Sequence, residues 1–125
     1  MAKKALIAIV DDDESIRVST ANLIRAFGFA ARGFASAEEL LQSPELGETS
    51  CVISDVQMPG IDGLELQSRL ASTHRRTPVI FITAFPDLRI QERAIAGGAI
   101  CFLKKPFDGK TLIQCVDRAL NRSNS

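Results

Sequence analysis

Four short apolar runs, none of which alternates with polar residues, constrain the fold of this 125-residue chain more than any other feature. They occupy residues 5–10, 51–53, 79–82 and 99–103, and a weaker run covers residues 29–34. Continuous apolar runs of this length are typical of strands that are covered on both faces, as in a parallel sheet. The chain is therefore expected to bury a sheet between layers of helices.

Helical patterns lie between these runs. They cover residues 15–27, 36–41, 63–72, 87–96 and 108–120. Gly28 is a stop signal for the first, Ser36 and Glu39 form a capping box for the second, and Asp108 can cap the last. Strand and helix thus alternate five times, which predicts an α/β domain with a mostly parallel sheet and right-handed crossovers.

Charge and composition exclude some classes of function. The chain carries 15 basic and 15 acidic residues, so its formal net charge is zero, which argues against binding nucleic acid through bulk charge. Its apolar content of 46% argues against wholesale disorder, and its length suits one domain. The balance hides an acidic cluster at residues 11–14, with no basic residue between Lys4 and Arg17.

The cysteines and the amino terminus predict a cytoplasmic location. Cys51, Cys101 and Cys115 are odd in number and show no CxxC spacing. They are interpreted as small buried hydrophobic residues in a reducing compartment, rather than as metal ligands or redox thiols. The apolar run at residues 5–10 is too short for a signal-peptide core or a membrane span, so no membrane partner is expected.

Every expected strand except the second ends in a charged or hydroxyl side chain. These are Asp11, Asp12 and Asp13 after the first strand, Asp55 at the third, Thr83 at the fourth, and Lys104 and Lys105 after the fifth. In open parallel sheets, ligands bind outside the carboxyl ends of the strands. The side chains are therefore expected to converge at one edge of the sheet.

The chemistry of this group favours phosphoryl transfer. Clustered carboxylates repel one another unless a cation lies among them, and oxygen ligands without His or Cys favour Mg²⁺. The ammonium of Lys105 and the hydroxyl of Thr83 would suit phosphate oxygens. A carboxylate in this setting can act as a nucleophile and form an aspartyl-phosphate.

Each residue alone also has a simpler interpretation. An Asp after a strand often forms a turn or caps a helix, and Asp13 or Glu14 could merely support the first helix dipole. Lys105 could be solvated, Thr83 could be an ordinary strand residue, and His74 is expected in a solvated loop. The joint occurrence at four strand ends makes coincidence the weaker explanation.

A second enzyme class fits part of the pattern. Asp11 and Asp13 resemble the first motif of the haloacid-dehalogenase phosphohydrolases, with Asp11 as nucleophile, Asp13 as acid and base, Thr83 as the second motif and Lys105 as the third. Against this stand the lack of a later acidic pair, the lack of room for a larger core or cap, and the absence of any role for Asp55.

The pattern as a whole resembles the receiver domain of two-component response regulators. The matching segments are residues 9–13, 55–63, 78–84 and 98–107, in the order of that family, and the resemblance spans about residues 5–121. It implies a flavodoxin-like, doubly wound (βα)₅ fold with a five-stranded parallel sheet in the order 2-1-3-4-5. Residues 122–125 would form a polar tail or the start of a linker.

The resemblance also implies roles for the acidic residues. Asp55 would accept a phosphoryl group from a phosphohistidine of a partner histidine kinase. Asp12 and Asp55 would bind Mg²⁺, or Mn²⁺ in its place, together with the backbone carbonyl of Gln57. Asp11 would orient a water molecule on the ion.

The remaining site residues would contact the phosphoryl group and report its presence. Thr83 and Lys105 would each bind a phosphoryl oxygen, with a backbone contact from Ala84. Phe102 would turn inward as Thr83 moves toward the phosphate, and the fourth helix, fifth strand and fifth helix would then change partner. The bond between Lys105 and Pro106 is expected to be cis, following the habit of the family.

Residues 34–40 look like the FixJ-like branch of the family, which often carries a LuxR-type DNA-binding output domain. The expected function is a phosphorylation-activated switch that controls a transcriptional output lying outside these residues. It would form a homodimer on phosphorylation, bind no nucleic acid directly, and catalyse only its own phosphorylation and dephosphorylation. The alternative within the family is a stand-alone phosphorelay or docking receiver.

Overall fold

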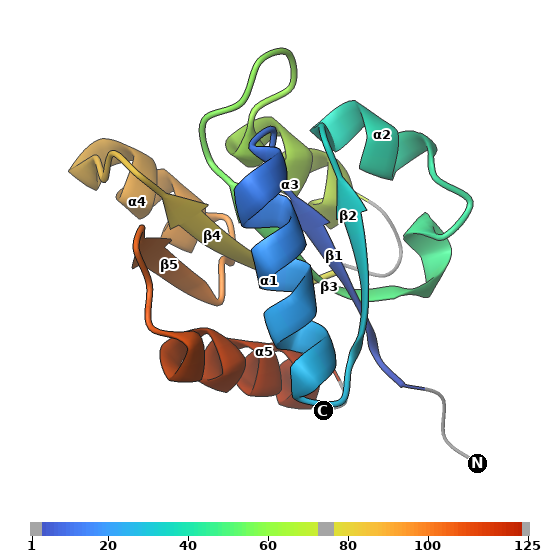
Figure 1. Ribbon diagram of the computed structural model, residues 1–125. Helices are drawn as coiled ribbons and strands as arrows, with labels where there is room; N and C mark the ends of the chain where they lie inside the picture. The colour runs from blue at the N-terminus through green and yellow to red at the C-terminus, as the bar shows by residue number, and fades with distance from the viewer. Residues whose placement is uncertain (1–3, 73–76, 124–125) are drawn as a thin grey trace.

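A five-stranded parallel sheet forms the middle layer of the chain and is covered by helices on both faces (Figure 1). The structure is a computed structural model that describes residues 4–72 and 77–123, so His74 and the last two residues of the expected polar tail lie outside the described residues. The strands are β1 (Leu6–Val10), β2 (Ala30–Phe34), β3 (Thr49–Asp55), β4 (Val79–Thr83) and β5 (Cys101–Lys104). The helices are α1 (Glu14–Ala26), α2 (Ala37–Gln42), a short 3₁₀ helix η1 (Leu46–Glu48), α3 (Gly63–Ala71), α4 (Leu88–Ala96) and α5 (Gly109–Ser123).

The order of the strands is β2-β1-β3-β4-β5, which confirms the expected doubly wound topology. Because β1 and β3 are adjacent although β2 separates them in sequence, the chain reverses its direction of winding beside β1. That reversal creates the switch point at which ligands bind in such sheets.

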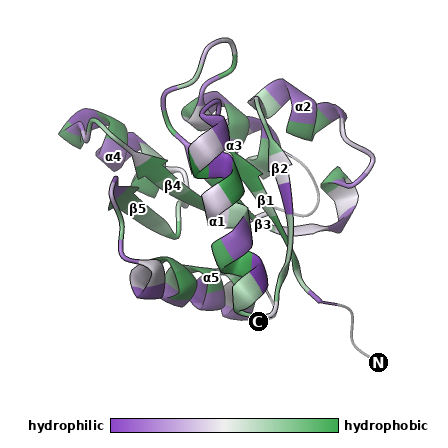
Figure 2. Ribbon diagram, viewed as in Figure 1, coloured by the Kyte–Doolittle hydropathy of each residue, from purple (hydrophilic) through white to green (hydrophobic). Residues whose placement is uncertain are grey.

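Successive residues of the central strands supply two separate cores. In β1, Ile7 and Ile9 pack with Ile24 of α1 and the apolar face of α5, whereas Ala8 and Val10 pack against α2, α3 and α4. Figure 2 shows the strands as the apolar centre of the molecule, with hydrophilic residues on the helices outside. Burial of both strand faces is the physical reason for the uninterrupted apolar runs.

Side-chain caps fix where four helices begin. Asp13, Ser36, Asp62 and Asp87 each accept a backbone N–H from the first turn of α1, α2, α3 and α4, respectively. These caps satisfy backbone donors that have no partner within the helix. The simpler interpretation of Asp13 as a helix cap is therefore confirmed, and so is the cap predicted at Ser36.

The interpretation of the cysteines is correct for one of the three and wrong for the other two. Cys51 is a free, fully buried thiol. Cys101 of β5 and Cys115 of α5 are joined by a disulfide bond, with their Cα atoms 6.2 Å apart. Spacing along the sequence could not reveal the pair, because only the turn from β5 into α5 places the two residues against each other.

The bond between Lys105 and Pro106 is cis, as expected. Within the described residues, none of the helices combines the length and apolar character needed to cross a membrane.

Gly63 allows a direct test of how closely the start of α3 packs against β3 and β4. A Cβ atom at Gly63 would lie 2.7 Å from the carbonyl oxygen of Asp55 and 2.9 Å from a ring carbon of Phe81. We expect Gly63→Ala to lower the free energy of unfolding by about 1–3 kcal/mol, because backbone and a packed ring must both shift. The measurement is chemical denaturation at equilibrium.

Gly109→Ala is the matched control. Gly109 also stands in the first turn of a helix, but its added Cβ would meet only Leu23 methyl carbons at 3.4 Å. The control should be neutral or slightly stabilising. Equal losses in the two variants would contradict the claim that close packing of α3 on β3 requires a glycine.

Candidate functional site

Side chains from three strand ends meet at the carboxyl edge of the sheet. Asp11, Asp12 and Asp55 each offer a carboxylate oxygen, and these oxygens lie within 4.8 Å of one another. Lys105, from the segment after β5, extends into this group, with Nζ 3.0 Å from Asp11 Oδ2 and 2.9 Å from Asp55 Oδ2. The expected convergence of strand ends one, three and five is therefore confirmed in the geometry.

The two carboxylates bound by Lys105 are held in the same way. In each, Oδ1 accepts a backbone N–H from the following loop: Asp11 from Asp13 at 2.9 Å, and Asp55 from Gln57 at 3.1 Å. In each, Oδ2 accepts the hydrogen bond from Lys105. Each strand end thus orients its own carboxylate, and the lysine joins the two strand ends.

Burial sets the electrostatics of this group. Asp11 is fully buried, and desolvation raises the pKa of its carboxyl, although hydrogen bonds from Asp13 and Lys105 oppose the rise. Burial by itself would lower the pKa of Lys105, but its hydrogen bonds and charge interactions with Asp55 and Asp11 outweigh burial and raise it. The ammonium therefore stays charged, and it compensates an acidic group that carries more negative charge than one lysine supplies.

The end of β4 brings a hydroxyl and a loop to the same edge. Thr83 is buried, and its Oγ1 accepts a hydrogen bond from the backbone N–H of Phe85 at 3.1 Å. Its carbonyl oxygen accepts the N–H of Lys105 at 2.7 Å, which ties the loop after β4 to the loop after β5. Ala84, between Thr83 and Phe85, is exposed.

Three of the predicted residues lie outside this group. Asp13 caps α1, so it is not one of the clustered carboxylates. Lys104 is exposed at the end of β5. Phe102 is half-buried on the face of β5 that packs toward α4, where its ring lies 6.4 Å from that of Phe81.

Arg17 is a contributor that sequence reasoning missed. Its Nη1 donates to the backbone carbonyl of Asp11 at 2.8 Å, which holds the loop that carries Asp11 and Asp12. The arginine reaches this carbonyl across Gly33 of β2, where a Cβ would lie 2.8 Å from Arg17 Cγ. The available signal was the position of Arg17 as the first basic residue after the acidic cluster, one helical turn beyond Asp13.

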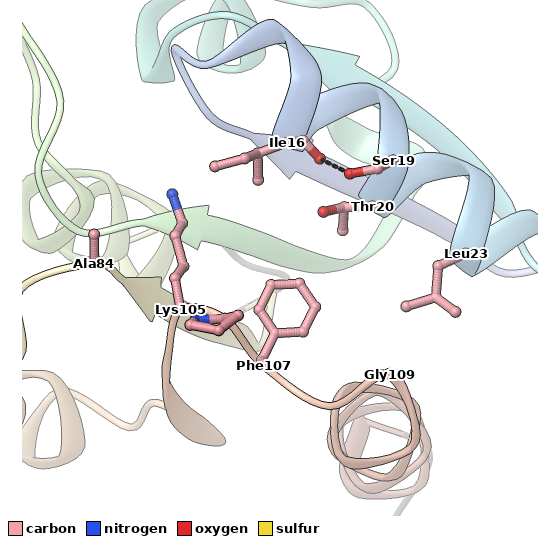
Figure 3. Close-up of a pocket in the computed structure, with 9 residues that line it drawn as sticks. Ile16, Ser19, Thr20, Leu23, Ala84, Lys105, Phe107 and Gly109 are labelled. Atoms are coloured by element: carbon pink, nitrogen blue, oxygen red, sulfur yellow. Dashed lines mark hydrogen bonds between the residues drawn. The ribbon is translucent and has the colours of Figure 1, made fainter.

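A pocket of about 570 Å³ adjoins Lys105 between α1 and the start of α5. Figure 3 shows Ile16, Thr20 and Leu23 on one side of it and Phe107 on the other, while the Lys105 side chain stands along its edge with Nζ directed away from Phe107. The pocket is mostly apolar, so it contributes shape beside the charged group.

The donor set suits a hard metal cation. The clustered ligands are carboxylate oxygens, and these three residues include neither a His nor a Cys. Asp12 is exposed to solvent, whereas both oxygens of Asp11 already accept hydrogen bonds. Oxygen ligands of this kind are typical of Mg²⁺ and Ca²⁺ sites, so the acidic group can hold a metal.

Comparison with known proteins places these observations in a family. The sequence model of the response regulator receiver domain matches residues 7–117. Nodulation protein W of Bradyrhizobium diazoefficiens is 43% identical over 95% of this chain, and the transcriptional regulatory protein FixJ of Azorhizobium caulinodans is 35% identical over 98%. The chain spans 52% and 58% of the length of these two relatives, respectively.

A solved structure agrees with this assignment. The crystal structure of FixJ-N has a TM-score of 0.84 to the chain and is 31% identical, with 96% of each chain covered. The fold is therefore shared over nearly the whole chain, and about a third of the aligned residues are identical. The chain belongs to the response regulator receiver domain family and is similar to its FixJ-like members.

Proposed function

We propose that Asp55 is the phosphoacceptor of a two-component signalling switch. The observation that carries the proposal is the position of its carboxylate, which is buried at the carboxyl end of β3 with Oδ2 2.9 Å from the Lys105 ammonium. A carboxylate held against a cation, beside a hydroxyl from the next strand, suits a nucleophile that must receive a highly charged group.

The proposed reaction is an in-line transfer. One oxygen of Asp55 bonds to phosphorus as the P–N bond of a kinase phosphohistidine breaks, and the histidine, already protonated on its other ring nitrogen, leaves as neutral imidazole. Lys105 then binds a phosphoryl oxygen. Thr83 Oγ1 accepts the Phe85 N–H in this structure, so its own O–H proton can be donated to another phosphoryl oxygen, while the Ala84 N–H supplies a backbone donor.

The residues present fit a divalent cation beside the acceptor. Asp12, Asp55 and the backbone carbonyl of Gln57 would hold Mg²⁺, or Mn²⁺ in its place, and Asp11 would support them from its buried position. When bound, the ion neutralises the charge that builds up on the transferring phosphoryl group. The chain is proposed to catalyse only its own phosphorylation and dephosphorylation.

Phosphorylation would favour one arrangement of two loops that are already linked. An added phosphoryl group carries about −1.5 to −2 charges. Binding it draws Thr83 away from Phe85 and releases space toward which Phe102 can turn. To convert a population of 1:99 into 99:1, the modification must favour the active arrangement by about 5.5 kcal/mol.

The surface of α4, β5 and α5 is the proposed output. Phe85, in the loop before α4, and Leu88 and Ile95, on α4, are large apolar side chains that are 74%, 69% and 55% exposed, respectively. Apolar surface of this kind is typical of a partner interface. We infer a homodimer on phosphorylation, made through α4-β5-α5.

The wider biology follows from the relatives. FixJ is named as a transcriptional regulatory protein, and the chain covers 58% of its length. We therefore propose a cytoplasmic protein that is phosphorylated by a histidine kinase and controls a transcriptional output, with residues 1–121 as the receiver unit and no direct nucleic-acid contact from that unit. A stand-alone phosphorelay or docking receiver is the alternative. The gene sequence after codon 125 distinguishes the two, because only the first requires an output domain to be encoded there.

Phosphorylation by acetyl phosphate tests the acceptor. With Mg²⁺ present, we expect the intact mass to rise by one phosphoryl group, and Asp55→Asn to abolish the gain, because an amide cannot serve as the nucleophile. Asp62→Asn is the matched control: it keeps the α3 cap, since Asn caps as well as Asp, and it should still be phosphorylated. Label mapped to Asp11 would instead support the phosphohydrolase interpretation.

Mg²⁺ binding can be measured separately by thermal unfolding. At ten times its dissociation constant, Mg²⁺ should stabilise the chain by about 1.4 kcal/mol. Asp12→Ala should lose this gain, and it should unfold at a higher temperature than the unsubstituted chain when Mg²⁺ is absent, because one of three repelling carboxylates is gone. A Mg²⁺ response that survives in Asp12→Ala would refute the proposed ligand set.

The dimer is tested by sedimentation of the phosphorylated chain. Leu88→Arg should keep the chain monomeric, because it places a charge in the apolar surface of α4. Val18→Arg on α1 is the control, since Val18 is 50% exposed on a helix outside the proposed interface, and it should leave the dimer intact. Dimerisation that only the α1 variant prevents would assign the interface to the other side of the molecule.

A further inference from the structure

A second chemically reactive feature lies outside the acidic group. Cys101 at the start of β5 and Cys115 in α5 are joined, and 14 positions of sequence separate them. Between them runs the segment that carries Lys105 and turns from the sheet into α5. The bond therefore connects strand and helix on either side of the loop that supplies the lysine of the acidic site.

The two sulfur atoms have different surroundings. Cys115 is buried in the core between the sheet and α5, whereas Cys101 is half-buried. The guanidinium of Arg118, nearly one turn beyond Cys115 on the same helix, lies with Nη1 3.8 Å from the Cys101 sulfur. A neighbouring cation and partial exposure are the conditions under which a cysteine is present as a reactive thiolate.

Cys51 provides the contrast within the same chain. It is fully buried in β3, and desolvation raises the pKa of its thiol to about 12. A thiol of this kind stays protonated and unreactive. The chain thus contains one pair of cysteines with an accessible, cation-assisted member and one isolated cysteine without either property.

We propose that Cys101 and Cys115 form a reversible redox site, in which Cys101 is the thiol that reacts with small disulfides and Cys115 is the thiol that resolves the product. In proteins of the cytoplasm, the location proposed above, disulfides are usually transient and often sense redox state. The site has its own residues and chemistry, so it does not depend on phosphorylation of Asp55.

The chemistry balances with glutathione disulfide as the oxidant. The Cys101 thiolate attacks one sulfur of the oxidant, so that a mixed disulfide forms and one glutathione thiolate leaves. Cys115 gives up its proton to solvent and attacks the Cys101 sulfur, which releases the second glutathione. The protein dithiol loses two electrons and two protons, and one glutathione disulfide becomes two glutathione molecules.

Oxidation would change the same part of the molecule that the proposed switch uses. Cys101 packs on the α5 side of β5, while the next residue, Phe102, packs on the opposite side toward α4. Closing the bond ties this strand to α5 and limits how far β5, the Lys105 segment and α5 can move apart. Redox state would thereby adjust the stiffness of the α4-β5-α5 surface.

The test uses the fully reduced chain, glutathione disulfide near neutral pH, and intact mass as the readout. The unsubstituted chain and Cys51→Ser should each lose two hydrogen atoms in mass and regain them with millimolar glutathione. Cys115→Ser should instead stop as a mixed disulfide, with glutathione on Cys101. The oxidised chain should unfold roughly 5–10 °C above the reduced chain, because the closed loop restricts the unfolded state.

Arg118→Gln isolates the role of the cation. Its reaction with glutathione disulfide should be roughly three- to tenfold slower, because the thiolate fraction falls and greater nucleophilicity offsets only part of the loss. Lys110→Gln, which removes an exposed positive charge elsewhere on α5, should react at the original rate.

Three results would overturn the proposal. One is a chain that forms no bond between Cys101 and Cys115, and another is a bond that millimolar glutathione leaves intact. The third is a rate of reaction with glutathione disulfide that is unchanged in Arg118→Gln. None of these outcomes bears on phosphorylation, since no variant alters Asp55 or the residues that contact it.

Discussion

The ammonium of Lys105 is the interaction on which the rest of the site depends. It binds Asp11 and Asp55 at 3.0 and 2.9 Å, although these residues precede it by 94 and 50 positions in sequence. Without this cation, buried carboxylates at adjacent strand ends would face each other uncompensated, and the penalty of an unpaired buried charge is large. The parallel sheet brings the carboxylates together, and the ammonium of Lys105 offsets their mutual repulsion.

Lys105 compensates the negative charge of the carboxylates only in part, and the remaining charge suits the site to binding a cation. The Lys105 ammonium contacts two of the three clustered carboxylates, those of Asp11 and Asp55, so the group retains an excess of negative charge that a divalent cation would neutralise. A zero net charge for the whole chain conceals this local excess. Because the loop of Lys105 is hydrogen-bonded to Thr83, a change of charge at Asp55 acts on both loops together.

Much of this could be read from the sequence because it rests on local rules. Apolar runs located all five strands, and the capping box at Ser36 located the start of α2. The rule that parallel strands present their carboxyl ends at one edge then predicted that Asp11, Asp55 and Lys105 would meet. Strand ends were less well predicted: β3 runs from Thr49 to Asp55, because polar residues such as Ser54 are buried within it and interrupt the apolar run.

The sequence by itself determined the α/β alternation and the chemical types at the sheet edge, since these depend on periodicity and on the direction of the strands. Only the tertiary structure decided which groups touch. It placed Cys101 against Cys115, carried Arg17 across Gly33 to the Asp11 carbonyl, and set the Gln67 amide 2.8 Å from the carbonyl of Ala94. The physical reason is that such contacts depend on how helices pack over the sheet, which no local pattern of residues records.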